Sequence, residues 1–194
     1  MAVSLEAWAR HKEPADLTLD LVLALILFAL AIPILSDIYA GKAAAPVASP
    51  KATQKASTQI AALRQAIVGQ ESGGHCETTN HSGSGAAGLA QVMPENIAAW
   101  SREAIGREVS LSEFLKDCGL QVRVVDFKLA QYWQEEAQTA NESMIVRRVA
   151  ARWYAGRATL YDSAAPQYWN GTSYPSVRDY TLLVLERYQR HRFT

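Results

Sequence analysis

The stretch from Glu71 to Pro94 reads ESGGHCETTNHSGSGAAGLAQVMP and decides the fold of the region around it. Its glycine and serine content predicts a loop. Before it, Ile60, Leu63 and Ile67 recur at helical spacing, and Gly73-Gly74 stops that pattern. Pro94, as the first residue of a helix, opens the next helical segment. The stretch therefore predicts an irregular loop between two helices.

Glu71 breaks the pattern of its helix. It follows Ile67 by one helical turn, so it projects from the apolar stripe at the last turn of the helix. Burial and the negative end of the helix dipole both disfavour the ionised carboxylate, and both therefore raise its pKa. A carboxyl group with a raised pKa can act as a general acid near neutral pH. The alternative is a helix that frays at Gln70, with Glu71 pointing into water.

The rest of the chain after Ser57 repeats mainly at the helical period, and no alternating β run of any length competes. Ser110 and Glu113 form a capping-box pattern in front of a short helix. One helix is expected to start at Ser57, a second to run from Pro94 to a stop at Gly106, and a third, short helix to follow Ser110 and end at Gly119. Three more are expected over Leu120–Asn141, Ser143–Ala155 and Ser176–Phe193. The sequence therefore predicts a mainly α domain over residues 57–194.

Length and composition narrow the class of protein. A chain of 194 residues leaves room for one domain and a short appendage. Lys+Arg and Asp+Glu both number 19, and no basic stripe is clustered, so no nucleic-acid partner is expected. Two cysteines exclude a disulfide-dense mini-protein, and no Cys/His cluster has zinc spacing, so neither a metal site nor a cofactor is expected.

The most apolar segment, LVLALILFALAIPIL, runs from Leu21 to Leu35. As a helix, Leu17–Leu35 spans roughly 28 Å, close to the ~30 Å hydrocarbon core of a bilayer. We expect residues 17–40 to be a single-pass signal-anchor helix after an N-terminal flank, 1–16. A buried core helix and a cleaved signal peptide are the alternatives. The absence of a polar face counts against the first, and the mixed-charge flank counts against the second.

Residues 41–56, GKAAAPVASPKATQKA, are rich in Ala, Pro and Lys without apolar periodicity. They are expected to be a linker between the anchor and the domain. Positive charges balance on the two sides of the anchor, so they do not set its orientation.

Three blocks of the domain resemble the lytic transglycosylase family of the soluble (SLT) type, which shares the lysozyme fold. Glu71-Ser72-Gly73, Ser82 and Gly85–Pro94 match the pattern E-S-G, a spacer, S-x-x-G-A-x-G-L-x-Q-[IV]-M-P. Ala151–Gly156 is similar to A-x-Y-N-[AS]-G, and Pro175–Tyr188 to P-x-T-R-x-Y-V-x-x-V-L-x-x-Y. The resemblance covers Ser57 to about Arg192 and implies a lysozyme-like (SLT/goose-type) helical domain.

This resemblance implies cleavage of the β-1,4 bond between N-acetylmuramic acid and N-acetylglucosamine in peptidoglycan, with Glu71 as the single catalytic acid/base. Two-carboxylate glycosidases place a second acid within about 10 Å. The nearby acids Glu77 and Glu95 match no catalytic position of the family. The missing second carboxylate favours assistance by the 2-acetamido group of the substrate, with a 1,6-anhydromuramyl product.

The same match implies the substrate-binding residues, which are Ser82, Gln91, Met93, Trp153, Tyr154 and Tyr180. Met93 could instead fill the core. Trp153-Tyr154 stands where the family has Tyr-Asn, so the tyrosine that approaches the carboxylate is either replaced by Trp153 or supplied by Tyr154. The loop Arg157–Tyr174 carries Tyr161, Tyr168, Trp169 and Tyr174, whose rings either stack on sugars or cover the end of the core.

The resemblance also places Cys76 and Cys118 outside the cytoplasm, where they either pair in a disulfide or remain two free buried thiols. The leading hypothesis is a membrane-anchored lytic transglycosylase whose domain faces peptidoglycan on the extracytoplasmic side. A muramidase on the same fold and a non-catalytic wall-binding module are the rivals. Envelope remodelling, a secretion or conjugation apparatus and a virion membrane all remain open as its setting.

Overall fold

The computed structural model describes residues 50–80, 83–138, 141–169 and 171–193. These residues belong to one compact unit, Ser49–Thr194. The predicted flank, 1–16, and the predicted anchor, 17–40, lie outside the described residues. Within the described ranges, no helix combines the length and the apolar character needed to cross a membrane.

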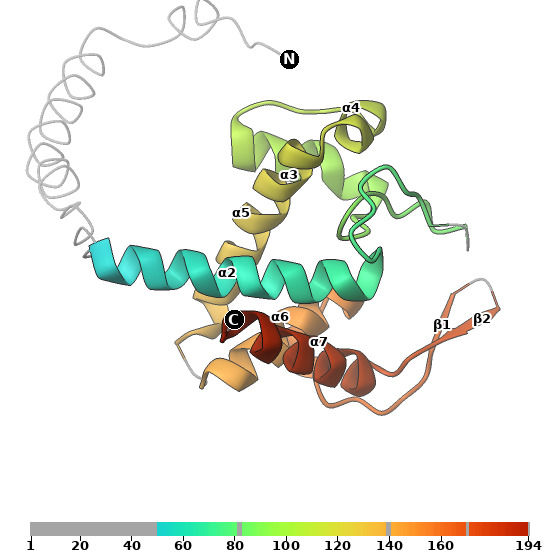
Figure 1. The fold of residues 1–194 in the computed structure, drawn as a ribbon. Helices are drawn as coiled ribbons and strands as arrows, with labels where there is room; N and C mark the ends of the chain where they lie inside the picture. Colours follow the sequence, from blue (N-terminus) through green and yellow to red (C-terminus); the bar gives the residue numbers. More distant parts are fainter. Residues whose placement is uncertain (1–49, 81–82, 139–140, 170, 194) are drawn as a thin grey trace, which may run out of the picture. The chain divides into compact units, whose positions relative to one another are not determined.

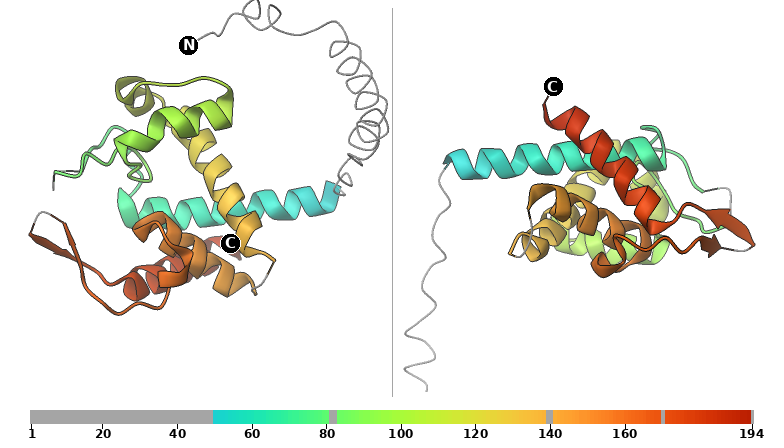
Figure 2. Two further views of the ribbon diagram at one scale, coloured as in Figure 1. Left: turned by 180° about the vertical axis from the view of Figure 1, so that it is seen from behind. Right: turned by 90° about the horizontal axis from the view of Figure 1, so that it is seen from below.

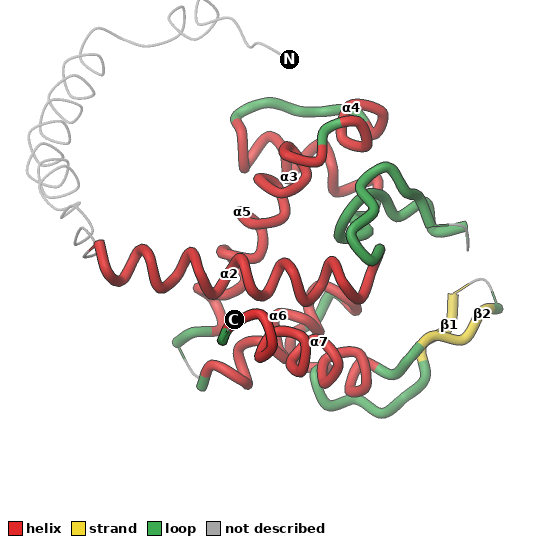
Figure 3. Tube along the Cα trace, viewed as in Figure 1, coloured by secondary structure: helices red, strands yellow, loops and turns green. Residues whose placement is uncertain are grey.

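The domain is mainly α, as the sequence predicts (Figures 1 and 3). Its helices and strands are α2 (Pro50–Glu71), α3 (Pro94–Ile105), α4 (Leu111–Lys116), α5 (Cys118–Glu136), α6 (Glu142–Ala155), the 3-10 turn η2 (Ala158–Leu160), β1 (Gln167–Trp169), β2 (Thr172–Tyr174) and α7 (Val177–Arg192). The antiparallel hairpin β1–β2, in which Gln167 pairs with Tyr174, was not predicted.

Helix α2 begins at Pro50, inside the segment expected to be a linker. The expected start near Ser57 was wrong. It relied on the apolar stripe of the helix, and residues 54–58 are exposed and present no such stripe. Alanine, lysine and glutamine, which recur in this segment, have a high intrinsic helix propensity. Local propensity therefore extends a helix whose buried part begins only at Gln59.

Most ends of the other helices follow their sequence signals, but α4 ends at Lys116 and not at Gly119, and α5 runs from Cys118 to Glu136 and not from Leu120 to Asn141. The side chains of Ser110, Asn141 and Ser176 each accept a hydrogen bond from a backbone N–H three residues further on, at the starts of α4, α6 and α7. Gly106 and Gly156 end α3 and α6 in the left-handed conformation. The boundaries of these helices are thus fixed by local side-chain chemistry.

The core lies where α2 packs against α5 and α7, and where α6 packs against α7. Helix α7 packs against α2, lying beside it in the front view and crossing it obliquely in the view from below (Figures 1 and 2). The largest fully buried apolar side chains are Leu63, Ile67, Val92, Ile97, Phe114, Leu120, Val124, Val125, Leu129, Val146 and Val149. Leu63 and Ile67 belong to the helical stripe that ends in Glu71, so the core packing fixes the direction of that carboxylate.

Two irregular segments extend from the same side of the domain, at the end of α2 that carries Glu71. One is the loop 72–93 between α2 and α3, and the other is the segment 157–176 that contains the hairpin (Figures 1 and 2). The last turn of α2 therefore lies between two loop walls.

Candidate active site

Glu71 is the last residue of α2, and the helix does not fray before it. The backbone N–H groups of Ser72 and Gly73 both donate to the carbonyl oxygen of Val68, which closes the helix end. Burial raises the pKa of Glu71 from 4.5 to about 7, while a hydrogen bond from Tyr180 acts in the opposite direction. Glu71 is thus a partly buried carboxyl that changes protonation state near neutral pH.

Tyr180, from the first turn of α7, holds this carboxyl from behind. Its hydroxyl donates a 2.5 Å hydrogen bond to Oε1 of Glu71, and only 3% of its surface is exposed. The ring of Tyr154 lies parallel to the ring of Tyr180, with the centroids 4.1 Å apart. Burial raises the pKa of Tyr154 to about 12, and it raises the pKa of Tyr180 further above its ordinary value. Both phenols therefore stay protonated.

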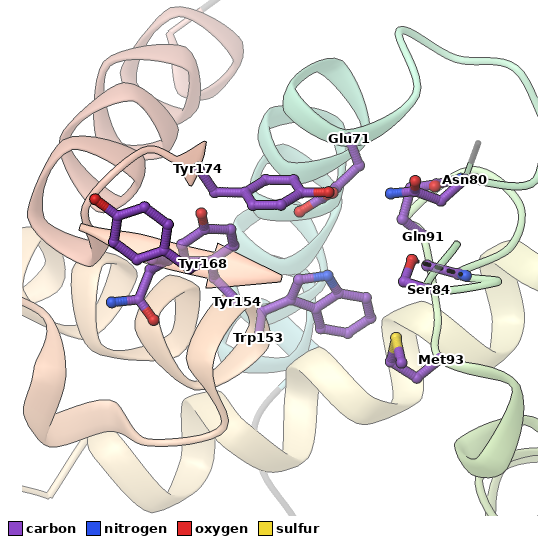
Figure 4. Close-up of a pocket in the computed structure, with 11 residues that line it drawn as sticks. Glu71, Asn80, Ser84, Gln91, Met93, Trp153, Tyr154, Tyr168 and Tyr174 are labelled. Atoms are coloured by element: carbon purple, nitrogen blue, oxygen red, sulfur yellow. Dashed lines mark hydrogen bonds between the residues drawn. The ribbon is translucent and has the colours of Figure 1, made fainter. Parts of the chain in front are cut away.

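An open cleft of about 280 Å³ lies in front of the carboxyl (Figure 4). Its lining is polar and aromatic and consists of Glu71, Asn80, Ser84, Ala86, Gln91, Met93, Trp153, Tyr154, Gln167, Tyr168 and Tyr174. Among these described residues, Glu71 is the one carboxyl group, and there is no lysine or arginine. The cleft therefore offers one proton-transfer group and otherwise uncharged surface for a ligand.

The loop wall of the cleft is tied down at two successive residues, Leu89 and Ala90. The Ser72 hydroxyl donates to the Leu89 carbonyl at 2.6 Å, and the backbone N–H of Leu89 donates to Oε1 of Gln121 at 2.7 Å. Trp153 Nε1 donates to the Ala90 carbonyl at 3.1 Å. Side chains from the end of α2, from α5 and from α6 thus converge on one short piece of backbone.

Gln121 is fully buried and has every polar group bonded. Its amide nitrogen donates to the carbonyl oxygens of Cys76 and Phe114, each at 2.8 Å. Gly88 makes room for it, because a Cβ added at Gly88 would lie 2.2 Å from Oε1 of Gln121. Sequence reasoning missed Gln121, since a glutamine within an amphipathic helix gives no signal of burial.

Gln91 has a strained backbone conformation in this loop. It has a φ of 50°, a left-handed conformation that residues other than glycine rarely adopt. Its side-chain amide donates to the Gly88 carbonyl at 3.0 Å, which helps to hold that conformation. Strained residues of this kind are concentrated at binding and catalytic sites.

The hairpin wall is anchored at both of its ends. On one side, Arg147 donates to the Tyr161 carbonyl and to the Asp162 carboxylate, each at 2.9 Å. On the other side, the Tyr154 hydroxyl donates to the Pro175 carbonyl at 3.0 Å. Ser163 links the two ends, because its carbonyl accepts the backbone N–H of Arg178 at 3.0 Å. The hairpin therefore projects from a fixed base.

Cys76 and Cys118 form a disulfide with a Cα–Cα distance of 5.5 Å. The bond joins the loop after Glu71 to the first residue of α5. Together with the hydrogen bond between Gln121 and the Cys76 carbonyl, it fixes the outer part of the loop wall. No group of three or more His, Cys, Asp or Glu side chains in the described ranges could hold a metal ion.

The structure brings together most of the residues that the sequence singled out. Glu71, Gln91, Met93, Trp153 and Tyr154 line the cleft. Tyr180 lies behind it, so its place is beside the carboxyl group and not on the cleft surface. Ser82 lies outside the described residues. Glu77 and Glu95 are exposed and do not line the cleft.

Of the two aromatic residues in the Trp153-Tyr154 pair, Tyr154 is the one stacked on Tyr180. Trp153 reaches towards the loop wall and packs against Trp100, with the ring centroids 5.6 Å apart. Asn80, Ser84 and Gln167 line the cleft without having been predicted. No protein-family model, curated protein or solved structure matches this chain, and what the site does is therefore inferred from its own residues.

Proposed function

We propose that this protein is a lytic transglycosylase with a lysozyme-like domain, which cleaves the glycan strands of peptidoglycan between N-acetylmuramic acid and N-acetylglucosamine. The observation that carries the proposal is the single carboxyl group of the described cleft, Glu71, whose pKa is raised by burial to about 7. Such a group is protonated often enough to act as an acid and ionised often enough to act as a base at neutral pH.

The first step is proton transfer from Glu71 to the glycosidic oxygen. Tyr180 occupies Oε1 with its hydrogen bond, so Oε2 is the oxygen that carries the proton. The C1–O4 bond breaks, O4 takes the proton, and N-acetylglucosamine leaves as an alcohol. The developing positive charge at C1 is met by the carbonyl oxygen of the 2-acetamido group of the same sugar, because the described cleft offers no second carboxylate.

In the second step, the ionised Glu71 takes the proton from the C6 hydroxyl of the muramic acid. O6 then forms a bond to C1 and displaces the acetamido oxygen. The product is a 1,6-anhydro sugar, no water is consumed, and Glu71 returns to its protonated state. One residue thus serves as acid and then as base, which suits a carboxyl with a pKa near the working pH.

Digestion of purified peptidoglycan by the full chain in detergent, followed by mass spectrometry of the fragments, tests this proposal. The expected products carry 1,6-anhydromuramyl ends and are one water lighter than hydrolytic products. Glu71→Gln should remove them, while the matched variant Glu77→Gln, which changes an exposed carboxyl group of the loop after α2, should retain them. Fragments with reducing muramic acid ends alone would identify a muramidase instead. Full activity in Glu71→Gln would show that the site is wrong.

The proposed setting is a bilayer, with Leu17–Leu35 as the anchor and the domain on the extracytoplasmic side. The support is the apolar segment in the sequence, which is long enough to span the hydrocarbon core. The full chain should sediment with membranes after alkaline carbonate extraction. Replacement of Leu25 and Phe28 by arginine should release it into the supernatant, and release of the parent chain would overturn the assignment.

A further inference from the structure

The hairpin β1–β2 presents two tyrosine rings at the cleft without any described hydrogen bond to hold them. Tyr174 extends from β2 towards Glu71 and is partly buried (Figure 4). Tyr168, from β1, borders the same cleft, yet 68% of its surface is exposed. A bound ligand that covers an exposed aromatic ring at the rim of a cleft removes its apolar area from water, which favours binding.

Strand geometry separates the two rings. Gln167 pairs directly with Tyr174, and Tyr168 pairs with Ser173, so Tyr174 and Tyr168 occupy successive positions of the ladder. Side chains of successive positions leave a strand pair on opposite faces. Tyr174 therefore faces Glu71, while the ring of Tyr168 leaves the opposite face of the hairpin, at the rim of the cleft (Figure 4).

The base of the hairpin is held on both sides. Arg147 holds the segment that leads into β1, and its guanidinium also lies over the ring of Tyr161 at 5.0 Å. Tyr154 and Ser176 hold the segment that follows β2, through the Pro175 carbonyl and the cap of α7. The backbone at the base of the hairpin is thus held in place before a ligand arrives, which lowers the entropic cost of ordering this segment on binding.

The chemistry of the wall fits a sugar. A β-1,4-linked hexosamine has an apolar face of C–H groups and an edge of hydroxyl and amide groups. Tyrosine rings cover such faces, and Gln167, Asn80 and Gln91 supply amides around the same cleft. The described lining contains no cation, so it favours the uncharged sugar backbone over the charged stem peptide of a cell wall.

We propose that the hairpin β1–β2 is a glycan-binding wall, in which Tyr174 stacks on a sugar next to Glu71 and Tyr168 stacks on a sugar further along the strand. This inference rests on the proposed function and extends it, because it states how the same cleft distinguishes longer glycan chains from shorter ones. It assigns Tyr168 and Tyr174 as substrate-binding residues and the uncharged β-1,4 hexosamine chain as the ligand.

Binding of chitin oligosaccharides to the full chain tests the wall without turnover. The protein carries Glu71→Gln throughout, and titration calorimetry compares an oligomer of three sugars with one of six. Tyr168→Ala should weaken binding of the six-sugar chain by about fivefold to tenfold and leave the three-sugar chain within about twofold. Tyr174→Ala should weaken the binding of both.

Two further variants separate stacking from a structural effect. Tyr168→Phe keeps the ring and should bind both oligomers like the parent. Phe193→Ala removes a ring that is 85% exposed at the other end of α7 and should change neither affinity. A six-sugar affinity that is unchanged in Tyr168→Ala, or a loss that is equal for both lengths, would overturn the assignment.

The readout is separate from the proposed function. Failure to form anhydro ends would reject the transglycosylase but would leave the binding comparison intact. Conversely, anhydro products from a protein whose glycan affinity ignores both tyrosines would reject the wall alone.

Discussion

The hydroxyl of Tyr180 donates a 2.5 Å hydrogen bond to Oε1 of Glu71, across 109 positions of sequence. Burial raises the pKa of Tyr180 well above its ordinary value, so its hydroxyl remains a hydrogen-bond donor at neutral pH. A fixed donor favours the ionised carboxylate and thus limits the rise in pKa that burial causes. Tyr180 therefore both orients the acid and sets the pH at which it loses its proton.

Tyr180→Phe should raise the pKa of Glu71 further, because burial remains while the opposing hydrogen bond is lost. The rate of peptidoglycan cleavage, which needs the protonated acid, should then decline at a higher pH than in the parent. The maximal rate should fall, since Oε1 loses the donor that orients it. A turbidity assay of wall clearance over a pH series measures both effects.

Tyr188→Phe is the matched control for that experiment. Tyr188 is another buried tyrosine of α7, and its hydroxyl bonds to Glu142 at 2.6 Å, outside the described cleft. Its loss should leave the pH of half-maximal rate unchanged. A midpoint that moves to lower pH in Tyr180→Phe would contradict the role assigned to Tyr180.

Glu71→Gln should stabilise the folded protein at alkaline pH. The pKa of Glu71 is raised in the folded state, so its contribution to stability is complete below pH 4.5 and is lost as the pH rises through about 7. Removal of the charge should therefore raise the free energy of unfolding at pH 8 by up to about 3 kcal/mol. The difference should vanish below about pH 4.5.

Urea unfolding of the full chain at both pH values measures this gain. Glu77→Gln, an exposed carboxyl of the neighbouring loop, should show no such dependence on pH. Equal stability of parent and Glu71→Gln at pH 8 would mean that the carboxyl is solvated in the folded protein.

Gly88→Ala should disrupt the loop wall of the cleft. Gly88 has a φ of 74°, and an added Cβ would lie 2.2 Å from Oε1 of Gln121. Displacement of Gln121 leaves the Leu89 N–H without its partner, which adds about 1–3 kcal/mol to the cost of the left-handed backbone. The unfolding temperature and the rate of glycan cleavage should both fall.

Gly106→Ala provides the comparison, because Gly106 has a φ of 78° with no atom within 4 Å of an added Cβ. It should lose only about 1–2 kcal/mol from backbone strain and keep its activity. If the two alanine variants were equally stable and equally active, the close approach of Gln121 to Gly88 would have no energetic weight.

Reduction of the disulfide should lower the stability of the domain strongly and should lower the activity of the cleft much less. Cys76 and Cys118 are 42 residues apart, and a loop of that length corresponds to about 4 kcal/mol of stabilisation. The three hydrogen bonds of the Gln121 amide remain after reduction, and the two with Leu89 and Cys76 keep the loop on α5. We expect a lower unfolding temperature with cleavage largely retained at low temperature. The double variant Cys76→Ser, Cys118→Ser should match the reduced protein, and an unchanged unfolding temperature would contradict this.

The sequence predicted most of the helices because their stop and start signals are local. Pro94, Ser110 and Gly156 mark ends that depend on neighbouring residues only, and the structure has helix boundaries at each of them. The position of Glu71 in the apolar stripe likewise follows from helical spacing. The hydrogen bond to Tyr180 needs the packing of α7 on α2, which no local sequence signal predicts.

The hairpin and Gln121 could not be predicted in the same way. Strands of three residues are too short to show alternation, although Asn170-Gly171 is a common hairpin turn and could have signalled one. Gln121 lies in a helix whose other buried positions are mostly apolar, and its burial depends on three carbonyl and amide groups contributed by other segments. Asn80 and Ser84 belong to a loop whose path is set by long-range bonds.

Helix α2 continues without a break from Pro50 to Glu71. At 1.5 Å per residue it is a rod about 33 Å long, so its two ends, Pro50 and Glu71, lie that far apart. The helix also fixes a rotation, because one residue inserted among the exposed residues 54–58 would turn Pro50 by about 100° around the helix axis relative to the cleft. The number of residues in α2 thus sets both the distance and the rotation of the Glu71 carboxyl group relative to Pro50.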